Sequence, residues 1–517
     1  MILNKKMNFF ILTILAVGLI YRLFISSNGN FIFNMDNARD MVDVREMVIL
    51  KHLRLIGPTT SVDGVFYGPA WYYIQSVPFI FSGGNPYASI LMEIMFWAIG
   101  GYFLLTLVNK NYGMLSTFAV GLIWIASNFI LLGSQYAFNP NPILFLTPVF
   151  IWSLLKFSET KKMFYQVMAF FLGGLFLQFS VPVGIFTTVV IVIYSGFTEG
   201  LKFFKTRAFF LGVLSFIATL VPQFVFDLRH GFPMTQALLE YRSTSHGQII
   251  TDPALRFPQI LKSFYSVLLP TFQNFELFTK IIIIGFILSL LRILRKEKIF
   301  DDKLTLLCIL LVAVPLIGFI PLKVDLLGWY FNASIVASIF LVGFVLKTLQ
   351  NVKVMGNIGA YTLVAILFIN TTQNIKNYVL DAQNSNSNNS ILRNELSAID
   401  YTYKEANGKN FKVYVYMPSV IDYPYQYLYW WHGTNKYGYL PEDYAYLPNV
   451  PEYIKQKEKF SASTDDLRKR EDSNLIFLIK EPDQIGQRHL WENSFKNLPT
   501  LSTKNFGSII VETRKEK

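Results

Sequence analysis

The stretch "NMDNARDMVD", residues 34–43, follows the first apolar segment of the chain and holds a dense group of charged side chains: Asp36, Arg39, Asp40 and Asp43. The residues after "NMD" have a helical pattern. At about 100° per residue, the four charged side chains share one face and apolar side chains share the opposite one. Such a helix can lie in the plane of a membrane interface, with its apolar side toward lipid or other helices.

The composition of the whole chain is that of a membrane protein. Of its 517 residues, 52% are hydrophobic and 15% are charged, whereas soluble domains carry about 25% charged residues. The single cysteine, Cys308, excludes a disulfide framework and a Cys/His metal site. The net charge of +12 does not indicate nucleic-acid binding, because the basic residues cluster at the ends of apolar segments, where they set topology.

Eleven segments approach the roughly 20 apolar residues that a spanning helix needs. They are 7–25, 87–108, 112–132, 140–157, 163–180, 182–198, 207–227, 277–295, 303–321, 329–348 and 354–371. If the spans alternate in direction, the basic loops all fall on one side, which the positive-inside rule makes cytoplasmic. We therefore expect a multi-pass plasma-membrane protein with its N-terminus in the cytoplasm. The loops 26–86 and 228–276 and the C-terminal tail are then outside.

The composition also predicts the domain organisation. Residues 1–371 form an all-α transmembrane domain, in which 26–86 is a long first outer loop. A polar linker, 372–392, contains "DAQNSNSNNS". Residues 393–517 then read as a small extracytoplasmic α/β domain, with strands at 411–418, 474–481 and 508–515. We expect its aromatic segment, 423–448, to be an interfacial belt or domain core rather than a substrate surface.

Over about residues 1–370, the chain resembles the polytopic GT-C glycosyltransferases of families 39 and 83. These are the protein O-mannosyltransferases and the lipid A aminoarabinose transferases. The motifs that carry the resemblance are "NMDNARD" after the first span, "LIGPTTS", "YGPAWYYI", "AFNPNP" and "PQFVFDLRHGF". Their order and the arrangement of spans also match.

The resemblance implies that an acceptor hydroxyl attacks the anomeric carbon of a polyprenyl-phosphate-linked sugar at the outer membrane face, with inversion. It assigns Asp36 as the catalytic base and Arg39 as a contact to the donor phosphate. The acceptor stays open among a glycan, a lipid and a protein.

The sequence departs from these families at three points. Gly68 precedes Pro69 where the aminoarabinose enzymes have a phosphate-binding lysine. Asn37 follows Asp36 where the mannosyltransferases have an acidic pair. The Asp-x-Asp metal motif of the related oligosaccharyltransferases is absent around Asp36. We therefore expect no metal and no cofactor beyond the lipid-linked donor.

Without a metal, the charge that develops on the leaving phosphate needs Arg, Lys or His donors. Arg229 and His230, at the outer end of the seventh span, are further candidates. The alternative for them is interfacial snorkelling with Asp227 as a partner.

Four more residues are candidates for the substrate cavity: Asp40, Asp43, Tyr67 and Glu93. Asp40 and Asp43 can orient Arg39 or bind acceptor hydroxyls, or they can form a solvated helix face. Glu93 lies inside the second span, near its outer end, where a carboxylate is costly. We expect it to line the cavity or to pair with Arg45 or Arg54, and the alternative is that it reaches headgroup water.

Two other classes of function stay open. A transporter or lipid flippase would suit eleven spans, although no internal repeat of the kind common in transporters is evident. A polysaccharide polymerase or ligase would share the lipid-linked donor on a different fold.

Overall fold

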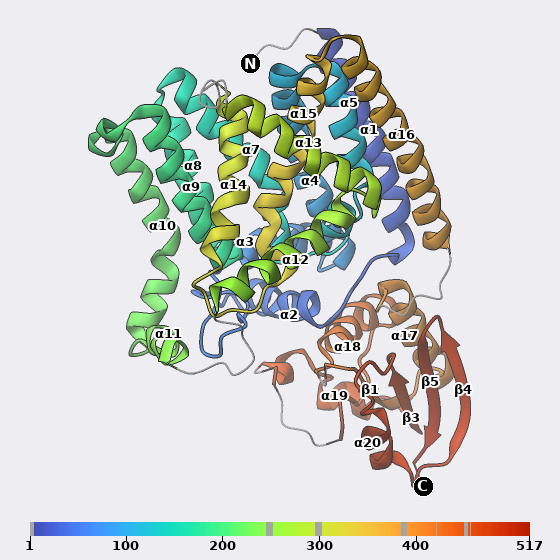
Figure 1. Ribbon diagram of the computed structural model, residues 1–517. Coiled ribbons are helices and arrows are strands. Elements are labelled where there is room, and N and C mark those ends of the chain that lie inside the picture. Colours follow the sequence, from blue (N-terminus) through green and yellow to red (C-terminus); the bar gives the residue numbers. More distant parts are fainter. Residues whose placement is uncertain are drawn as a thin grey trace. The chain divides into compact units, whose positions relative to one another are not determined.

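The computed structural model describes residues 5–243, 252–294, 302–383, 390–419, 421–448, 453–454 and 456–516 (Figure 1). These residues form two compact units. The first comprises Met1–Leu23, Arg54–Ile74 and Leu91–Asn377, and the second comprises Phe24–Leu53, Gln75–Ile90 and Tyr378–Lys517. This division differs from the expected boundary after residue 371, because most of the first outer loop, including residues 34–43, groups with the C-terminal residues.

The first unit consists of apolar helices. Seven described helices are long and apolar enough to cross a membrane: α1 (Lys5–Ser26), α4 (Pro86–Tyr112), α7 (Asn141–Thr160), α9 (Val181–Glu199), α10 (Arg207–Arg229), α15 (Asn332–Gln350) and α16 (Lys353–Gln383). Two pairs are long and apolar enough only when each pair is taken together, and both are bent at a short break: α5 (Met114–Ala126) with α6 (Asn128–Ser134), and α12 (Pro253–Thr271) with α13 (Glu276–Leu294). Two are shorter: α8 (Met163–Phe179) and α14 (Lys303–Gly318). Each predicted span therefore lies on an apolar helix, and the chain is a multi-pass membrane protein.

Helix α15 is the central span of this unit, because 94% of its most apolar window is buried. Small residues let neighbouring backbones approach it, as in other membrane bundles. Ser334 donates a hydrogen bond to the Leu311 carbonyl (2.8 Å), and Ser116 donates to the Gly343 carbonyl of α15 (3.0 Å). Helices α5, α7, α13 and α14 pack around it. The core of the unit thus combines apolar side chains with hydroxyl-to-carbonyl bonds.

The bend between α12 and α13 was not expected, since residues 228–276 were predicted to be an outer loop. Helix α11 (Pro233–Ser243) and α12 occupy most of the described part of that loop. The two helices of the pair meet at 118°. Gln273 and Asn274 turn the chain there with φ angles of 62° and 56°. Three prolines in α12 and its polar side chains hide the helix from a search for apolar runs.

The first outer loop holds two helices, α2 (Met35–Ile49) and α3 (Ala70–Ser82). The predicted helix after "NMD" is thus confirmed. The side chain of Asn34 accepts a hydrogen bond from the Asp36 amide, and the side chain of Asn37 accepts one from the Asn34 amide, so the two asparagines cap the helix start. Asp40 is 2% exposed, so the charged side chains of α2 do not all form a solvated face.

The C-terminal residues fold around a five-stranded sheet in the order β2-β1-β3-β5-β4. The strands are β1 (Asn410–Tyr416), β2 (Asp443–Ala445), β3 (Asp472–Lys480), β4 (Thr500–Phe506) and β5 (Ile509–Lys515). β1 is parallel to β2 and β3, and β5 is antiparallel to β3 and β4. The three predicted strands are confirmed as β1, β3 and β5. β4 was missed because it is a polar, exposed edge strand, a composition that protects sheet edges.

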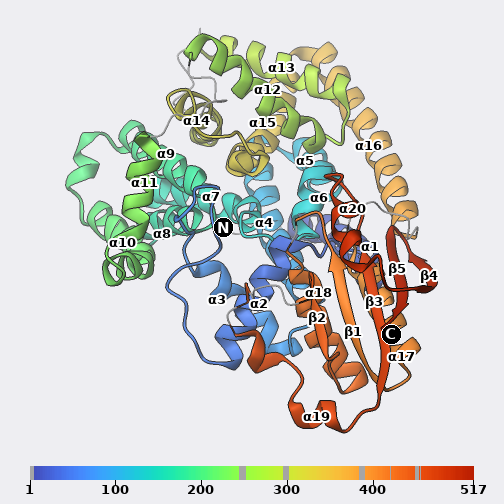
Figure 2. The same ribbon diagram turned by 90° about the horizontal axis from the view of Figure 1, so that it is seen from below.

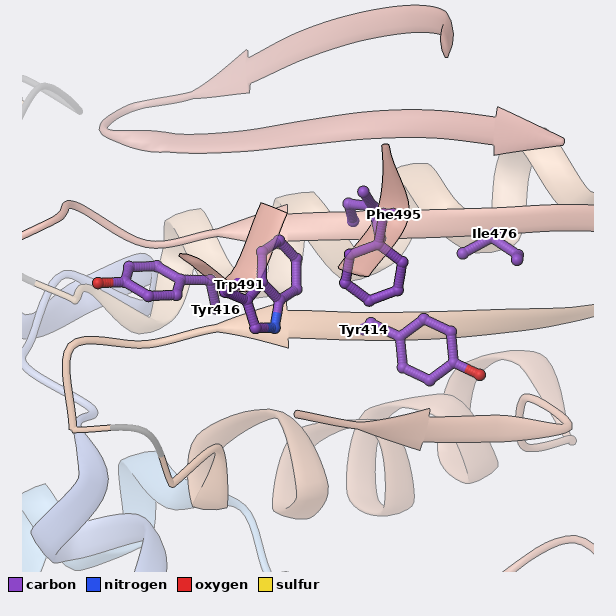
Figure 3. Close-up of a cluster of buried hydrophobic side chains, with 6 residues drawn as sticks. Tyr414, Tyr416, Ile476, Trp491 and Phe495 are labelled. Atoms are coloured by element: carbon purple, nitrogen blue, oxygen red, sulfur yellow. The ribbon is translucent and has the colours of Figure 1, made fainter. Parts of the chain in front are cut away.

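Helices cover both faces of this sheet: α17 (Leu392–Ala406) on one, and α20 (Arg488–Glu492) with η6 (Asn493–Phe495) on the other. Figure 3 shows the second face, where Tyr414 and Tyr416 of β1 meet Trp491 and Phe495. The Phe495 ring centroid lies 5.3 Å from that of Tyr414 and 4.8 Å from that of Trp491. Coverage on both sides explains why β1 and β3 read as apolar runs.

The aromatic segment 423–448 is largely domain core. Its elements are α18 (Tyr423–Leu428), the π-helix η4 (Tyr429–Tyr437) and β2. The side chains of Tyr425, Tyr427 and Tyr429 are buried. The remaining short elements are η1 (Ser27–Gly29), η2 (Leu201–Lys205), η3 (Gly328–Phe331), η5 (Lys457–Phe460) and α19 (Thr464–Arg468).

Candidate active site

The start of α2 brings together three of the predicted site residues. Nη1 of Arg39 lies 3.2 Å from an oxygen of Asp36, and Nε and Nη2 of Arg39 donate to an oxygen of Asp40 at 3.1 and 2.9 Å. The Asp36 side chain is 35% exposed, whereas that of Asp40 is 2% exposed. Of the two carboxylates that contact Arg39, Asp36 is therefore the one within reach of a substrate.

The Asp36 carboxylate also lies at the positive end of the α2 dipole. Asp36 is the second residue of the helix, where unsatisfied amides and the helix dipole give a partial positive charge. Arg39, one turn later, adds a full positive charge on the same side. Asp40 holds the Arg39 guanidinium through two of its nitrogens, so the orientation of Arg39 is fixed independently of Asp36.

Asp43, half-buried on the same helix, lies near Tyr423 of α18. Burial, together with the negative charge of Asp43, raises the pKa of Tyr423 to about 12, and Arg39 acts in the opposite direction. Tyr423 is therefore a neutral hydroxyl that can donate a hydrogen bond beside the acidic side chains of α2. Tyr423 belongs to the aromatic segment noted in the sequence, but nothing in the sequence predicted that this segment would lie near α2.

The first unit holds Gly68 and Tyr67. The Gly68 amide donates to the Gln178 carbonyl (3.3 Å), and the Gln178 side-chain oxygen accepts from the Ala70 amide (2.9 Å). A Cβ built on Gly68 would lie 2.4 Å from the Gln178 side chain. Gln178 thus fills the space that a lysine at this position would need. Tyr67 is buried, and its amide donates to the Pro58 carbonyl (2.9 Å).

Arg229 and His230 are exposed at the end of α10 in the same unit. Nδ1 of His230 donates to the Phe226 carbonyl (2.7 Å), and its ring lies 4.3 Å from the Phe226 ring. The expected partner of these residues, Asp227, instead accepts from the Met234 amide (2.7 Å) and the Thr235 hydroxyl (2.5 Å). Asp227 therefore stabilises the turn into α11. The role of Arg229 and His230 as phosphate contacts stays a prediction.

Glu93 lies in α4 and is fully buried. Both of its carboxylate oxygens lack a hydrogen-bond partner among the residues that the structure describes, so the expected ion pair of Glu93 is not found there. The described residues also contain no group of three or more His, Cys, Asp or Glu side chains that could hold a metal ion.

No protein-family model and no curated protein matches the sequence. The structure, however, resembles the crystal structure of ArnT from Cupriavidus metallidurans bound to undecaprenyl phosphate, with a TM-score of 0.62 and 12% sequence identity over 98% of each chain. It also resembles the apo state of that protein, with a TM-score of 0.60 and 12% identity over 98% of this chain and 97% of the other. At this identity the likeness concerns architecture. The chain therefore has the same overall fold as ArnT, in agreement with the architecture that its sequence motifs implied.

Proposed function

We propose that this protein is a membrane glycosyltransferase that moves a sugar from a polyprenyl-phosphate carrier to an acceptor hydroxyl at the outer membrane face. The observation that carries the proposal is the cluster of Asp36, Arg39 and Asp40 at the start of α2. It supplies one accessible carboxylate and one fixed guanidinium. The support from the fold is its likeness to ArnT, whose crystal structure contains undecaprenyl phosphate.

The proposed reaction is a single displacement with inversion. Asp36 accepts the proton of the acceptor hydroxyl while the hydroxyl oxygen forms a bond to the anomeric carbon. The bond between that carbon and the phosphate oxygen breaks on the opposite side, and its electron pair stays on the phosphate. A carboxylate acting as a general base typically accelerates such a step by about 10²–10⁴-fold. Arg39 holds Asp36 and is the proposed contact to the phosphate charge. Arg229 and His230 remain predicted phosphate contacts from the sequence alone.

We propose that the reaction needs no metal ion, since the Asp-x-Asp motif is absent around Asp36. Transfer by the purified protein should therefore continue at the same rate in excess EDTA. The sugar is a hexose or a pentose, and the acceptor is a glycan, a lipid or a protein.

The test is transfer from a radiolabelled polyprenyl-phosphate sugar by the purified protein. Asp36→Asn should lower the rate by about 10²-fold or more, because the amide cannot accept the proton. Asp63→Asn, an exposed change in the same outer loop, should leave the rate as in the wild type. Equal rates for Asp36→Asn and the wild type would exclude Asp36 as the base.

One observation favours transport as a second candidate. The bent pairs α5–α6 and α12–α13 are interrupted helices, a feature that many transporters use to build their binding sites. Flux of the lipid-linked sugar across proteoliposomes, without any covalent transfer, would support that function and contradict the first.

A further inference from the structure

The second half of α2 carries an arginine that the proposed reaction does not use. Arg45 is 2% exposed, and its guanidinium carbon lies 3.9 Å from the ring centroid of Phe460 and 5.0 Å from that of Trp430. Its Nε has no hydrogen-bond partner among the described residues. Fully buried arginines are normally paired with carboxylates. Here Asp43 and Glu46 act on the cation through their charge, and two aromatic rings lie against it.

The Trp430 ring is itself fixed from a second direction. It stacks on Phe79 at the end of α3, with 6.3 Å between centroids and 5° between the planes. One turn before Trp430, the Tyr427 hydroxyl donates to the Gly84 carbonyl (2.5 Å). A Cβ on Gly84 would lie 2.8 Å from that hydroxyl. Trp430 therefore has a defined position against which Arg45 can be held.

The start of α2 is attached to the C-terminal residues as well. The Phe33 amide donates to the Ser390 carbonyl (3.2 Å), and the Leu392 amide donates to the Phe31 carbonyl (3.1 Å). Between these contacts, Ile32 and Ile391 form an antiparallel bridge. Helix α18 packs beside α2, as Figure 2 shows within the second unit. Residues of the C-terminal domain thus contact α2 near both of its ends.

Arg45 and Asp36 lie on one continuous helix, about 14 Å apart along its axis at 1.5 Å per residue. A tilt of the helix at Arg45 therefore moves the Asp36 carboxylate. A displacement of about 1 Å in a catalytic group can cost about 10²-fold in rate. A contact that fixes the distal end of α2 is consequently a way of fixing its catalytic end.

We propose that Arg45, Trp430 and Phe460 form a clamp through which the C-terminal domain positions Asp36. Arg45 and Trp430 are positioning residues in this scheme, since neither contacts the reacting atoms. The effect of the clamp on catalysis rests on the proposed function, because it requires Asp36 to be the base. The contact of Arg45 with Trp430 and Phe460 does not depend on that function.

The test compares two adjacent tryptophans of η4. Trp430→Ala should lower kcat by about tenfold or more, because a tilt of α2 displaces Asp36 and, with it, Arg39. Trp430→Phe, which keeps an aromatic face, should restore most of kcat. Trp431→Ala removes the same side chain one position later and should behave like the wild type. Equal losses in Trp430→Ala and Trp431→Ala, or no loss in either, would overturn the proposal.

A double variant tests whether the two residues act through one contact. Arg45→Met should lower kcat about as much as Trp430→Ala, and the combination should be no worse than about twofold below either, because each change breaks the same interaction. If the fold-losses in kcat of the two single variants multiply in the double variant, the two residues act independently and the clamp is contradicted.

Hydrogen exchange of the wild type and variants separates this inference from the proposed function. The amides of Met35–Ile49 should exchange faster in Trp430→Ala and at the wild-type rate in Trp431→Ala. If the wild type transfers no sugar, the proposed function fails while the exchange experiment still decides the clamp. Unchanged exchange in Trp430→Ala would overturn the clamp whatever the activity.

Discussion

Gly68 stands where the aminoarabinose transferases that this sequence resembles have lysine, and its surroundings explain the difference. The Gln178 side chain occupies the space next to the Gly68 Cα. It accepts a bond from the Ala70 amide at the start of α3, and its amide nitrogen donates to the Thr219 carbonyl. Gln178 thus links α3 to α10, and its side chain fills the space that a side chain at position 68 would occupy.

This packing predicts a strong coupling between the two positions. Gly68→Ala should destabilise the protein by about 1–3 kcal/mol, the usual cost of overpacking. Adding Gln178→Ala should recover part of that loss, since it opens the space for the new methyl group. The readout is thermal unfolding in detergent. Gly359→Ala, where a new Cβ would meet nothing within 4 Å, is the control and should not destabilise. Additive losses at positions 68 and 178 would contradict the steric explanation.

Two glutamates near the start of α17 should make the stability of the protein depend on pH. Glu395 and Glu481 are both fully buried. Glu481 accepts from the Tyr425 hydroxyl (2.7 Å) and the Ser390 hydroxyl (3.3 Å), whereas the Glu395 carboxylate has no hydrogen-bond partner among the described residues. Burial, and then the neighbouring Glu481, raise the pKa of Glu395 above its ordinary value. Glu395 therefore keeps its proton to a higher pH in the folded protein than in the unfolded chain.

Because the folded-state pKa of Glu395 is raised, its contribution to stability is full at about pH 4 and decreases as the pH rises toward the folded-state pKa. Glu395→Gln removes this loss and should raise the unfolding temperature at pH 8–9 while changing it little near pH 4–5. Glu405→Gln, on the exposed side of the same helix, should have no such effect. The measurement is unfolding temperature against pH. Parallel curves for Glu395→Gln and the wild type would contradict a raised pKa of Glu395.

At the scale of elements, the bend between α12 and α13 depends on one buried polar side chain. Gln273 donates to the Thr371 hydroxyl (2.9 Å) and accepts from the Asn370 amide (2.9 Å), both on α16. It adopts a φ of 62° that non-glycine residues avoid, so these bonds offset local strain. The next residue, Asn274, shares the left-handed conformation but is exposed.

The two positions should therefore respond differently to substitution. Gln273→Ala removes the hydrogen-bond partner of Asn370 and Thr371 and should cost about 1–3 kcal/mol of stability. Asn274→Gly keeps a residue that tolerates positive φ and should be neutral or slightly stabilising. Thermal unfolding of the detergent-solubilised variants provides the comparison. A larger loss in Asn274→Gly than in Gln273→Ala would show that the turn, rather than the link to α16, holds the bend.

The sequence predicts those elements whose signal is local. Apolar length locates the spans, and the spacing after "NMD" locates α2. The burial of Asp40 and the stacking of Arg45 are different, since they depend on α18, η4 and η5, which come far later in the chain. Likewise, Gly68 departs from the pattern of the families that the sequence resembles, but Gln178, which explains the departure, lies in no motif. Side chains whose surroundings come from distant segments are therefore the part of the site that required the structure.

The number of spans decides on which side of the membrane each end of the chain lies. The count of eleven includes α8 and α14, which have 17 and 16 residues and are short for a bilayer of about 30 Å. If one of them fails to cross, the first outer loop and the C-terminal domain fall on opposite sides. The proposed function and the clamp both need them on the same side.

Labelling of single cysteines tests this topology directly. In a Cys308→Ser background, a membrane-impermeant maleimide should label Asp63→Cys and Lys404→Cys in right-side-out vesicles. Lys162→Cys and Lys202→Cys should react after permeabilisation, since the positive-inside rule places their loops in the cytoplasm. All four positions are exposed, so differences in labelling report the side of the membrane. Labelling of Asp63→Cys with protection of Lys404→Cys would mean an odd number of crossings between α1 and the C-terminal domain. The basic loops would then not explain the topology, and neither sugar transfer by Asp36 nor its positioning by Arg45 and Trp430 could operate as proposed.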